Sequence, residues 1–68
     1  MPFIQIEILK GRTREKKMKM IKNVTDVVAD ALECPKDAVK ICIREMELDH
    51  YAVAGIPWSE KKDLPYKL

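Results

Sequence analysis

The sequence predicts an α/β (α+β) fold in which a β-α-β unit with parallel strands is followed by a short C-terminal hairpin or arm. Apolar residues alternate at positions 3–9 and again at 39–45, which is the period of two expected of a strand. Over residues 14–32, apolar residues recur three and four positions apart, the spacing of an amphipathic helix. A strand, a helix of this length and a second strand form a right-handed crossover unit with parallel strands.

The first strand is expected to present one apolar face to the core. Its isoleucines, at positions 4, 6 and 8, share that face. The alternating positions form the other face, which consists of Phe3, Gln5, Glu7 and Leu9.

The helix is expected to run from about Arg14 to Leu32. Thr13 is a suitable N-cap, although Lys16 stands where a capping box needs Glu or Gln. The helix should end before Cys34, because a residue that precedes proline is pushed out of the helical region. Its apolar stripe consists of Met18, Ile21, Val24, Val27, Val28, Ala31 and Leu32.

The second strand, residues 39–45, again alternates, with Val39, Ile41 and Ile43 on one face and Lys40, Cys42 and Arg44 on the other. Residues 49–57 are expected to form the hairpin or arm, suited to lying on a neighbouring subunit. Residues 59–68 form a charged tail that is expected to be poorly ordered. The whole chain, residues 1–68, is interpreted as one domain.

Oligomerisation is the expected source of stability. A single core in a chain of 68 residues rarely stabilises a fold by more than about 3–5 kcal/mol, so disulfides, a metal or partner subunits are needed. Cys34 and Cys42 form no Cys-x-x-Cys pair, and His50 has no second histidine beside it. Neither a metal site nor a disulfide scaffold is therefore expected, and partner subunits remain.

Charge and hydropathy argue against nucleic-acid and membrane partners. No apolar run approaches the roughly 18 residues of a membrane span, and we find no leader with a cleavage site, so a cytoplasmic protein is expected. No aromatic residues for base stacking are interleaved with the basic residues around the turn and the first half of the helix. These basic residues are Lys10, Arg12, Arg14, Lys16, Lys17, Lys19 and Lys22.

A set of short motifs is specific when taken in order. Pro2 follows Met1 and opens the isoleucine-rich strand, which ends at the turn Lys10-Gly11-Arg12-Thr13. Cys34-Pro35, the strand Val39 to Glu45, Met46 and His50-Tyr51 follow. Up to about residue 55 the chain resembles the 4-oxalocrotonate tautomerase family. The resemblance implies an assembly that is typically a hexamer of three dimers, with active sites at subunit boundaries.

The resemblance implies that Pro2 is the catalytic residue and acts as a base. Removal of Met1 would expose the secondary amine of Pro2, and a small second residue favours that removal. An ordinary α-amino group has a pKa of about 7.7–8.0, so it is mostly protonated at neutral pH unless burial or neighbouring cations lower that value. We therefore expect cations and an apolar wall around Pro2.

Arg12 is expected to serve the Pro2 of another subunit. An extended chain from Pro2 to Leu9 spans about 23 Å, which is farther than an arginine side chain reaches back. A partner whose first strand runs antiparallel would bring strand start beside strand end. Lys40 opens the second strand, at the same sheet edge as Pro2, so it reaches Pro2 from its own chain or from an adjacent one.

The resemblance also implies substrate-binding roles for Arg12, Lys40 and Tyr51. In the family, the residue matching Arg12 binds a carboxylate, and an arginine at the position of Lys40 binds the other carboxylate and stabilises the enolate. Lysine offers a point charge instead of a planar fork, which puts the usual diacid substrate in question. Tyr51 stands where the family has a phenylalanine that keeps the pocket dry. Arg44 could replace Lys40 only if the substrate or the packing were shifted, and is otherwise an ion-pair residue.

The resemblance implies a tautomerase that works without metal or cofactor. Pro2 would move a proton in a small unsaturated oxo or hydroxy acid similar to 2-hydroxymuconate. Two alternatives stay open. Relatives in the superfamily add water to unsaturated acids or remove halide from them, and Glu7 or Glu45 could position the water. The chain could also be a non-catalytic member that keeps only the oligomeric scaffold.

Overall fold

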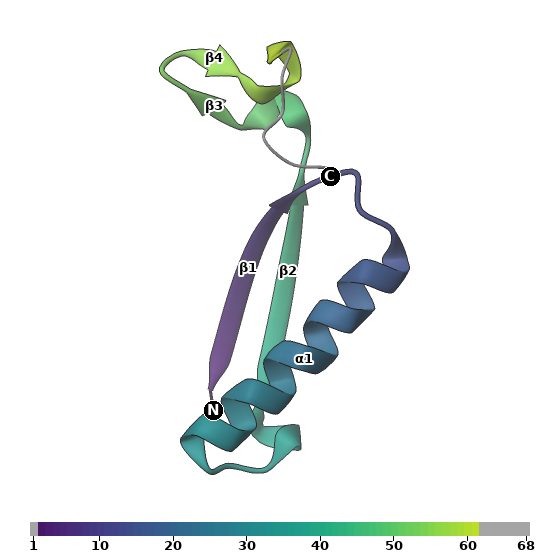
Figure 1. Ribbon diagram of the computed structural model, residues 1–68. Coiled ribbons are helices and arrows are strands. Elements are labelled where there is room, and N and C mark those ends of the chain that lie inside the picture. The colour runs from purple at the N-terminus through teal and green to yellow at the C-terminus, as the bar shows by residue number, and fades with distance from the viewer. Residues whose placement is uncertain (1, 62–68) are drawn as a thin grey trace.

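A computed structural model describes residues 2–61 and contains the predicted β-α-β unit (Figure 1). β1 (Phe3–Leu9) and β2 (Lys40–Met46) pair in parallel. The helix α1 (Arg14–Leu32) connects them and crosses one face of the pair (Figure 1). The predicted fold class is therefore confirmed.

The register places the starts of β1 and β2 side by side. Phe3 pairs with Lys40, whose backbone N–H donates to the Pro2 carbonyl at 3.0 Å. At the other end, the Lys10 N–H donates to the Met46 carbonyl at 2.9 Å. Because successive residues of a strand direct their backbone groups to opposite edges, the even-numbered residues of β1 bond to β2. The odd-numbered residues direct their N–H and C=O groups to an edge of β1 that is free in the described sheet.

The helix has the boundaries predicted from the sequence. Thr13 Oγ1 accepts a hydrogen bond from the Lys16 N–H at 3.3 Å, which makes Thr13 the N-cap. After Leu32, Glu33 takes a left-handed conformation with φ 54°, and its N–H donates to the Asp30 carbonyl at 3.3 Å. This conformation at the residue after a helix is common, although glycine is the usual occupant.

The second strand begins and ends one residue later than predicted. Lys36–Ala38 form a 3-10 helix that is not among the elements predicted from the sequence. The Val39 N–H donates to the Lys36 carbonyl at 3.1 Å and so closes this turn. Pairing with β1 therefore starts at Lys40 rather than at Val39.

The segment predicted as a hairpin or arm contains two short strands, β3 (Ala52–Val53) and β4 (Ile56–Pro57), that pair in antiparallel fashion. The two turn residues, Ala54 and Gly55, have φ of 54° and 80°, the positive values of a type I′ turn. The hairpin projects beyond the ends of β1 and β2 (Figure 1).

A small aromatic cluster closes this end of the molecule. The Trp58 N–H donates to the Tyr51 carbonyl at 2.7 Å, and the two rings meet edge to face with centroids 5.5 Å apart. Lys61 Nζ lies 5.0 Å from the centroid of the Trp58 ring. Of the predicted tail, Ser59 and Glu60 belong to the 3-10 helix Trp58–Glu60, and residues 62–68 lie outside the described residues.

The core of the single chain is thin. Among residues 2–61, the buried hydrophobic side chains are Leu9, Ala29 and Trp58. Val27 and Leu32 belong to the predicted apolar stripe but are 67 % and 59 % exposed. The molecule is also elongated, with extents of 43 × 22 × 16 Å. Two strands and one helix therefore leave much apolar surface exposed on the single chain.

Candidate active site

Pro2 lies just before β1 and beside the start of β2. Because its carbonyl accepts the Lys40 N–H, the register of the sheet fixes its position. The Lys40 side chain stays at this edge, where Nζ donates to the Asp37 carbonyl at 3.1 Å. The structure thus brings Pro2 and Lys40 together within one chain.

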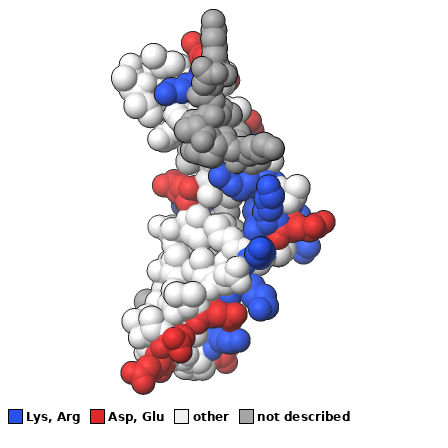
Figure 2. All heavy atoms as spheres, viewed as in Figure 1, with Lys and Arg blue, Asp and Glu red and all other residues white. Residues whose placement is uncertain are grey.

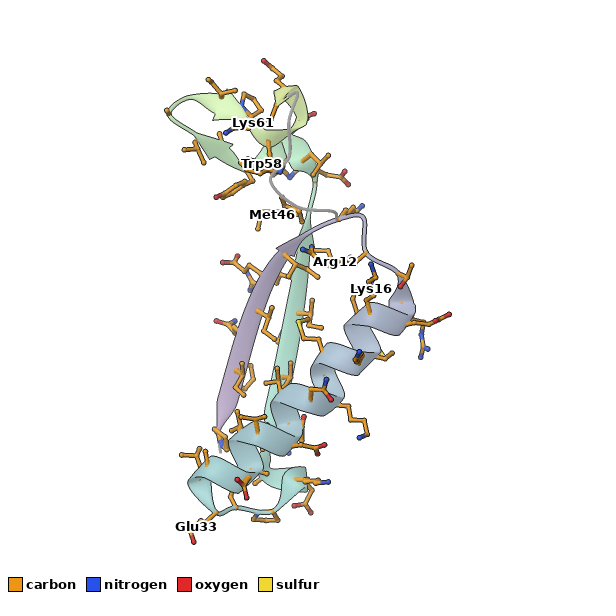
Figure 3. All side chains as sticks on the ribbon, in the orientation of Figure 1. Arg12, Lys16, Glu33, Met46, Trp58 and Lys61 are labelled. Carbon is orange, nitrogen blue, oxygen red and sulfur yellow. The ribbon has the colours of Figure 1, made fainter. Side chains whose placement is uncertain are left out.

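Arg12 lines a pocket at the other end of β1. The pocket has a volume of about 380 Å³. Its lining residues are Glu7, Ile8, Leu9, Arg12, Met46 and Tyr51. The Arg12 side chain turns back over the strand ends toward Met46 (Figure 3). A guanidinium group, a carboxylate and an apolar wall therefore meet in one place.

The Pro2 edge and the Arg12 pocket lie at opposite ends of β1, since Pro2 precedes the first residue of the strand and the pocket is lined by its last three residues. The strand separates them by about 23 Å. One chain alone does not bring Pro2 to Arg12 and Tyr51. The free edge of β1 is a surface through which a second copy could do so.

Arg44 and Glu7 are cross-strand neighbours on the sheet face opposite the helix, and both are exposed. Arg44 is not among the residues that line the Arg12 pocket, whereas Glu7 is. Glu45 lies on the helix side, where its carboxylate is 3.0 Å from Lys17 Nζ. Of the two acids that could position water, Glu7 alone lines this pocket.

No role in the site was predicted from the sequence for Met46 or Trp58. Met46 lines the pocket because the register pairs it with Leu9. The pairing of Phe3 with Lys40 leads to the same pair, since each lies six residues before its counterpart. Trp58 packs against the ring of Tyr51. In the sequence, Trp58 stands out only as a large apolar residue beside the charged tail.

An ion pair joins the segments that follow β1 and β2. Lys10 Nζ lies 2.6 Å from Glu47 Oε1. The hydrogen bond from Lys10 lowers the pKa of Glu47, and the same bond raises the pKa of Lys10. Both side chains are 56 % exposed, so solvent screens the interaction.

Basic residues gather along one edge of the molecule (Figure 2). Acids of the same chain neutralise some of them. Lys22 and Lys36 lie 3.6 Å and 3.0 Å from Asp26, and Lys17 contacts Glu45. Within residues 2–61, no three acidic, cysteine or histidine residues are grouped as metal ligands, and no helix has the length and apolarity to cross a bilayer.

Comparison with known proteins gives one consistent result. A family model described as "Tautomerase enzyme" matches residues 2–61. A 2-hydroxymuconate tautomerase of Pseudomonas sp. (strain CF600) is 37% identical, with 88% of this chain and 95% of the relative covered. The structure of YwhB, a homologue of 4-oxalocrotonate tautomerase, has a TM-score of 0.84 at 34% identity and covers 90% of this chain and 100% of its own. A heterohexameric 4-oxalocrotonate tautomerase of Chloroflexus aurantiacus has a TM-score of 0.84 at 30% identity, with 88% and 97% covered.

Proposed function

Because the chain belongs to the tautomerase family, as its sequence resemblance predicted, we propose that it interconverts enol or dienol acids and their conjugated keto forms. Tautomerases are isomerases, so the predicted enzyme class is confirmed. The proposed substrates are small unsaturated oxo or hydroxy acids related to 2-hydroxymuconate, the compound in the name of the Pseudomonas relative. The proposed mechanism uses no metal or cofactor, and we place it in the cytoplasm, where Cys34 and Cys42 would stay reduced.

The proposed site forms between two copies of the chain. Two β1 strands that run antiparallel would pair through their free edges and bring Pro2 of one copy beside Arg12 of the other. The free edge and the placement of Pro2 and the pocket at opposite strand ends support this arrangement. The complete assembly that we propose is a hexamer of three such dimers, and the related Chloroflexus protein is a heterohexamer.

In the proposed mechanism Pro2, freed of Met1, is the general base. Its ring nitrogen takes a proton from the 2-hydroxyl group, or from the carbon next to the carbonyl, and returns it further along the conjugated chain. Arg12 binds the carboxylate, and the Lys40 ammonium group stabilises the charge that develops on the enolate. Tyr51 and the apolar wall exclude water, which strengthens both interactions. The double bonds shift, and no other reagent is consumed.

The observation that carries this proposal is the separation of Pro2 from the Arg12 pocket along one strand. Pro2→Ala and Arg12→Ala proteins should each lose turnover of 2-hydroxymuconate by at least about a hundredfold, followed by UV absorbance. When the two are unfolded and refolded together, activity should return, because some hybrid sites contain both intact residues.

Each variant refolded with itself is the control for this experiment. A mixture that stays inactive would argue against a shared site, and a fully active Pro2→Ala protein would argue against the base. Intact-mass measurement on protein from its native host tests the remaining requirement, which is that Met1 is removed.

The Glu7 carboxylate at the pocket wall favours a second candidate, hydration or dehalogenation of unsaturated acids. In that reaction a carboxylate positions the attacking water. Halide release from 3-haloacrylates, with no turnover of hydroxydienoic acids, would support this candidate. A chain that acts on neither class would instead be a scaffold member of the family.

A further inference from the structure

The Arg12 pocket holds one cation and one anion. Arg12 and Glu7 both line it, and the rest of the wall is formed by apolar side chains and the ring of Tyr51. A site of this composition has one place for a carboxylate and one place that disfavours a carboxylate.

The charge of Glu7 is not neutralised by an ion pair within residues 2–61, unlike that of two nearby acids. Glu45 is 3.0 Å from Lys17, and Glu47 is 2.6 Å from Lys10. Arg44 is the cross-strand neighbour of Glu7, but the ion pairs of the described chain do not include one between them. The Glu7 charge at the pocket wall is therefore available to repel a second carboxylate of a bound acid.

Lys40 is a poor substitute for a second carboxylate-binding arginine. It offers one ammonium group, and one of the donors of that group is used by the Asp37 carbonyl at 3.1 Å. Lysine has no planar fork that binds two carboxylate oxygens at once. Of the two cations of the proposed site, Arg12 alone can bind a carboxylate in this bidentate way.

We propose that Glu7 makes this site selective for unsaturated acids with a single carboxylate and an uncharged tail. This inference rests on the proposed function. The carboxylate binds Arg12, and the tail lies against Tyr51 and Met46. A second carboxylate on the tail would be repelled by Glu7, and such repulsion is a common source of specificity. Glu7 is thus a specificity-determining residue of the pocket.

Two conjugated six-carbon acids test the selectivity without any need for turnover. Hexa-2,4-dienoate carries one carboxylate, and hexa-2,4-dienedioate carries two on the same carbon chain. Calorimetric titration of the processed oligomer should give an affinity at least about tenfold higher for the monoacid, a factor equal to about 1.4 kcal/mol.

Glu7→Gln removes the charge at an exposed position and keeps the size of the side chain, so the fold should be unchanged. The affinity for the diacid should rise about tenfold, and that for the monoacid should change little. The KM for 2-hydroxymuconate should accordingly fall, and that for 2-hydroxyhexa-2,4-dienoate should change little. Asp30→Asn is the matched control, because it removes the same charge from an exposed position of α1 outside the pocket.

Two results would overturn the selectivity: tighter binding of the diacid than of the monoacid by the unaltered protein, or an equal effect of Glu7→Gln on both ligands. Selective binding of the monoacid without turnover of either hydroxy acid would leave the selectivity standing. It would refute the tautomerase activity instead, so the two failures are distinguishable.

Discussion

The Lys40 side chain presents one ammonium group at the Pro2 edge, and this group is tied to the Asp37 carbonyl. An arginine at this position would add a planar fork for a carboxylate. Lys40→Arg should therefore lower the KM for 2-hydroxymuconate by about tenfold and change that for the monoacid less. Steady-state kinetics on both substrates measure this difference.

Lys19→Arg makes the same exchange at an exposed position of α1 and should alter neither KM. If Lys40→Arg raised the KM for the diacid, the role assigned to this position would be wrong.

The amine of Pro2 should set the pH dependence of turnover. The neighbouring cations and the apolar wall of the proposed site disfavour the protonated amine. The pKa of this amine should therefore lie below the ordinary α-amino value of about 7.7–8.0. The value of kcat/KM should rise with pH, inflect at that lowered pKa and level off above it. A pH–rate profile with its inflection at or above 8 would contradict this expectation.

The sequence predicted most of the proposed site at the level of single residues. The structure places Pro2 beside Lys40, as strand direction indicates. Arg12 and Tyr51 line one pocket at the other strand end, whereas Tyr51 was expected, from the family resemblance alone, to wall the pocket of Pro2. The position of Glu7 on the wall of the Arg12 pocket was not predictable from alternation alone. It depends on the twist of the strand end and on the direction in which Arg12 folds back, and neither has a signal in the sequence.

At the level of elements, the hairpin turn contains a strained position. Ala54 has φ 54°, a conformation that asparagine adopts at lower cost than alanine, and Asn-Gly is the preferred pair of a type I′ turn. Ala54→Asn should raise the free energy of unfolding by about 0.5 kcal/mol at fixed protein concentration. Denaturant titration of the variant and the unaltered protein measures this change in the free energy of unfolding.

Ala52→Asn, in β3, serves as the comparison for the turn variant. It should not stabilise the protein, because asparagine is disfavoured in strands. Equal effects of the two substitutions would mean that backbone conformation is not the cause.

The Lys10–Glu47 ion pair should contribute to stability only within a window of pH. The pKa of Glu47 lies below its ordinary 4.5, so its contribution is present above that value and is lost as pH falls through the lowered pKa. The pKa of Lys10 lies above its ordinary 10.5, so its contribution is lost as pH rises through the raised pKa. The destabilisation caused by Glu47→Gln should accordingly be present at neutral pH and disappear in acid.

Added salt should also reduce that destabilisation, because both side chains are exposed. Stability is measured by urea titration, with Glu60→Gln, at an exposed acid outside α1, as the control. An effect of Glu47→Gln that persisted in strong acid would point to packing rather than to charge.

The elements themselves were predicted closely where local chemistry determines them. The helix begins after the Thr13 cap and ends before Cys34 because those signals lie within one or two turns of the boundary. The 3-10 helix Lys36–Ala38 was missed, and with it the start of β2, because a single short turn after a proline has no periodic pattern.

For the whole molecule, the free edge of β1 is the surface on which the proposed assembly depends. Gln5 is an odd-numbered residue whose N–H should point to that edge, so Gln5→Pro removes a donor to a partner strand and leaves the ladder with β2 intact. We expect the variant to dissociate into smaller species in analytical ultracentrifugation and to lose activity in parallel.

Gln5→Ala removes the same side chain but keeps the backbone N–H, and should stay assembled and active. A fully active, assembled Gln5→Pro protein would exclude pairing through this edge. Chain length predicts that the protein needs partner subunits, and the thin core of the described residues agrees with this prediction. The geometry of the assembly was not predictable from the sequence, because it depends on which exposed faces of two copies fit together.

The length of β1 has an evolutionary consequence. If Pro2 of one copy must meet Arg12 of another, the number of residues in β1 sets the distance between these two residues. The same distance then applies to every site of the assembly. Loss of one residue would turn all later side chains to the opposite face, and loss of two would shorten the strand by about 7 Å. Insertions and deletions in a library of variants should therefore survive in the projecting hairpin and be eliminated between residues 3 and 9.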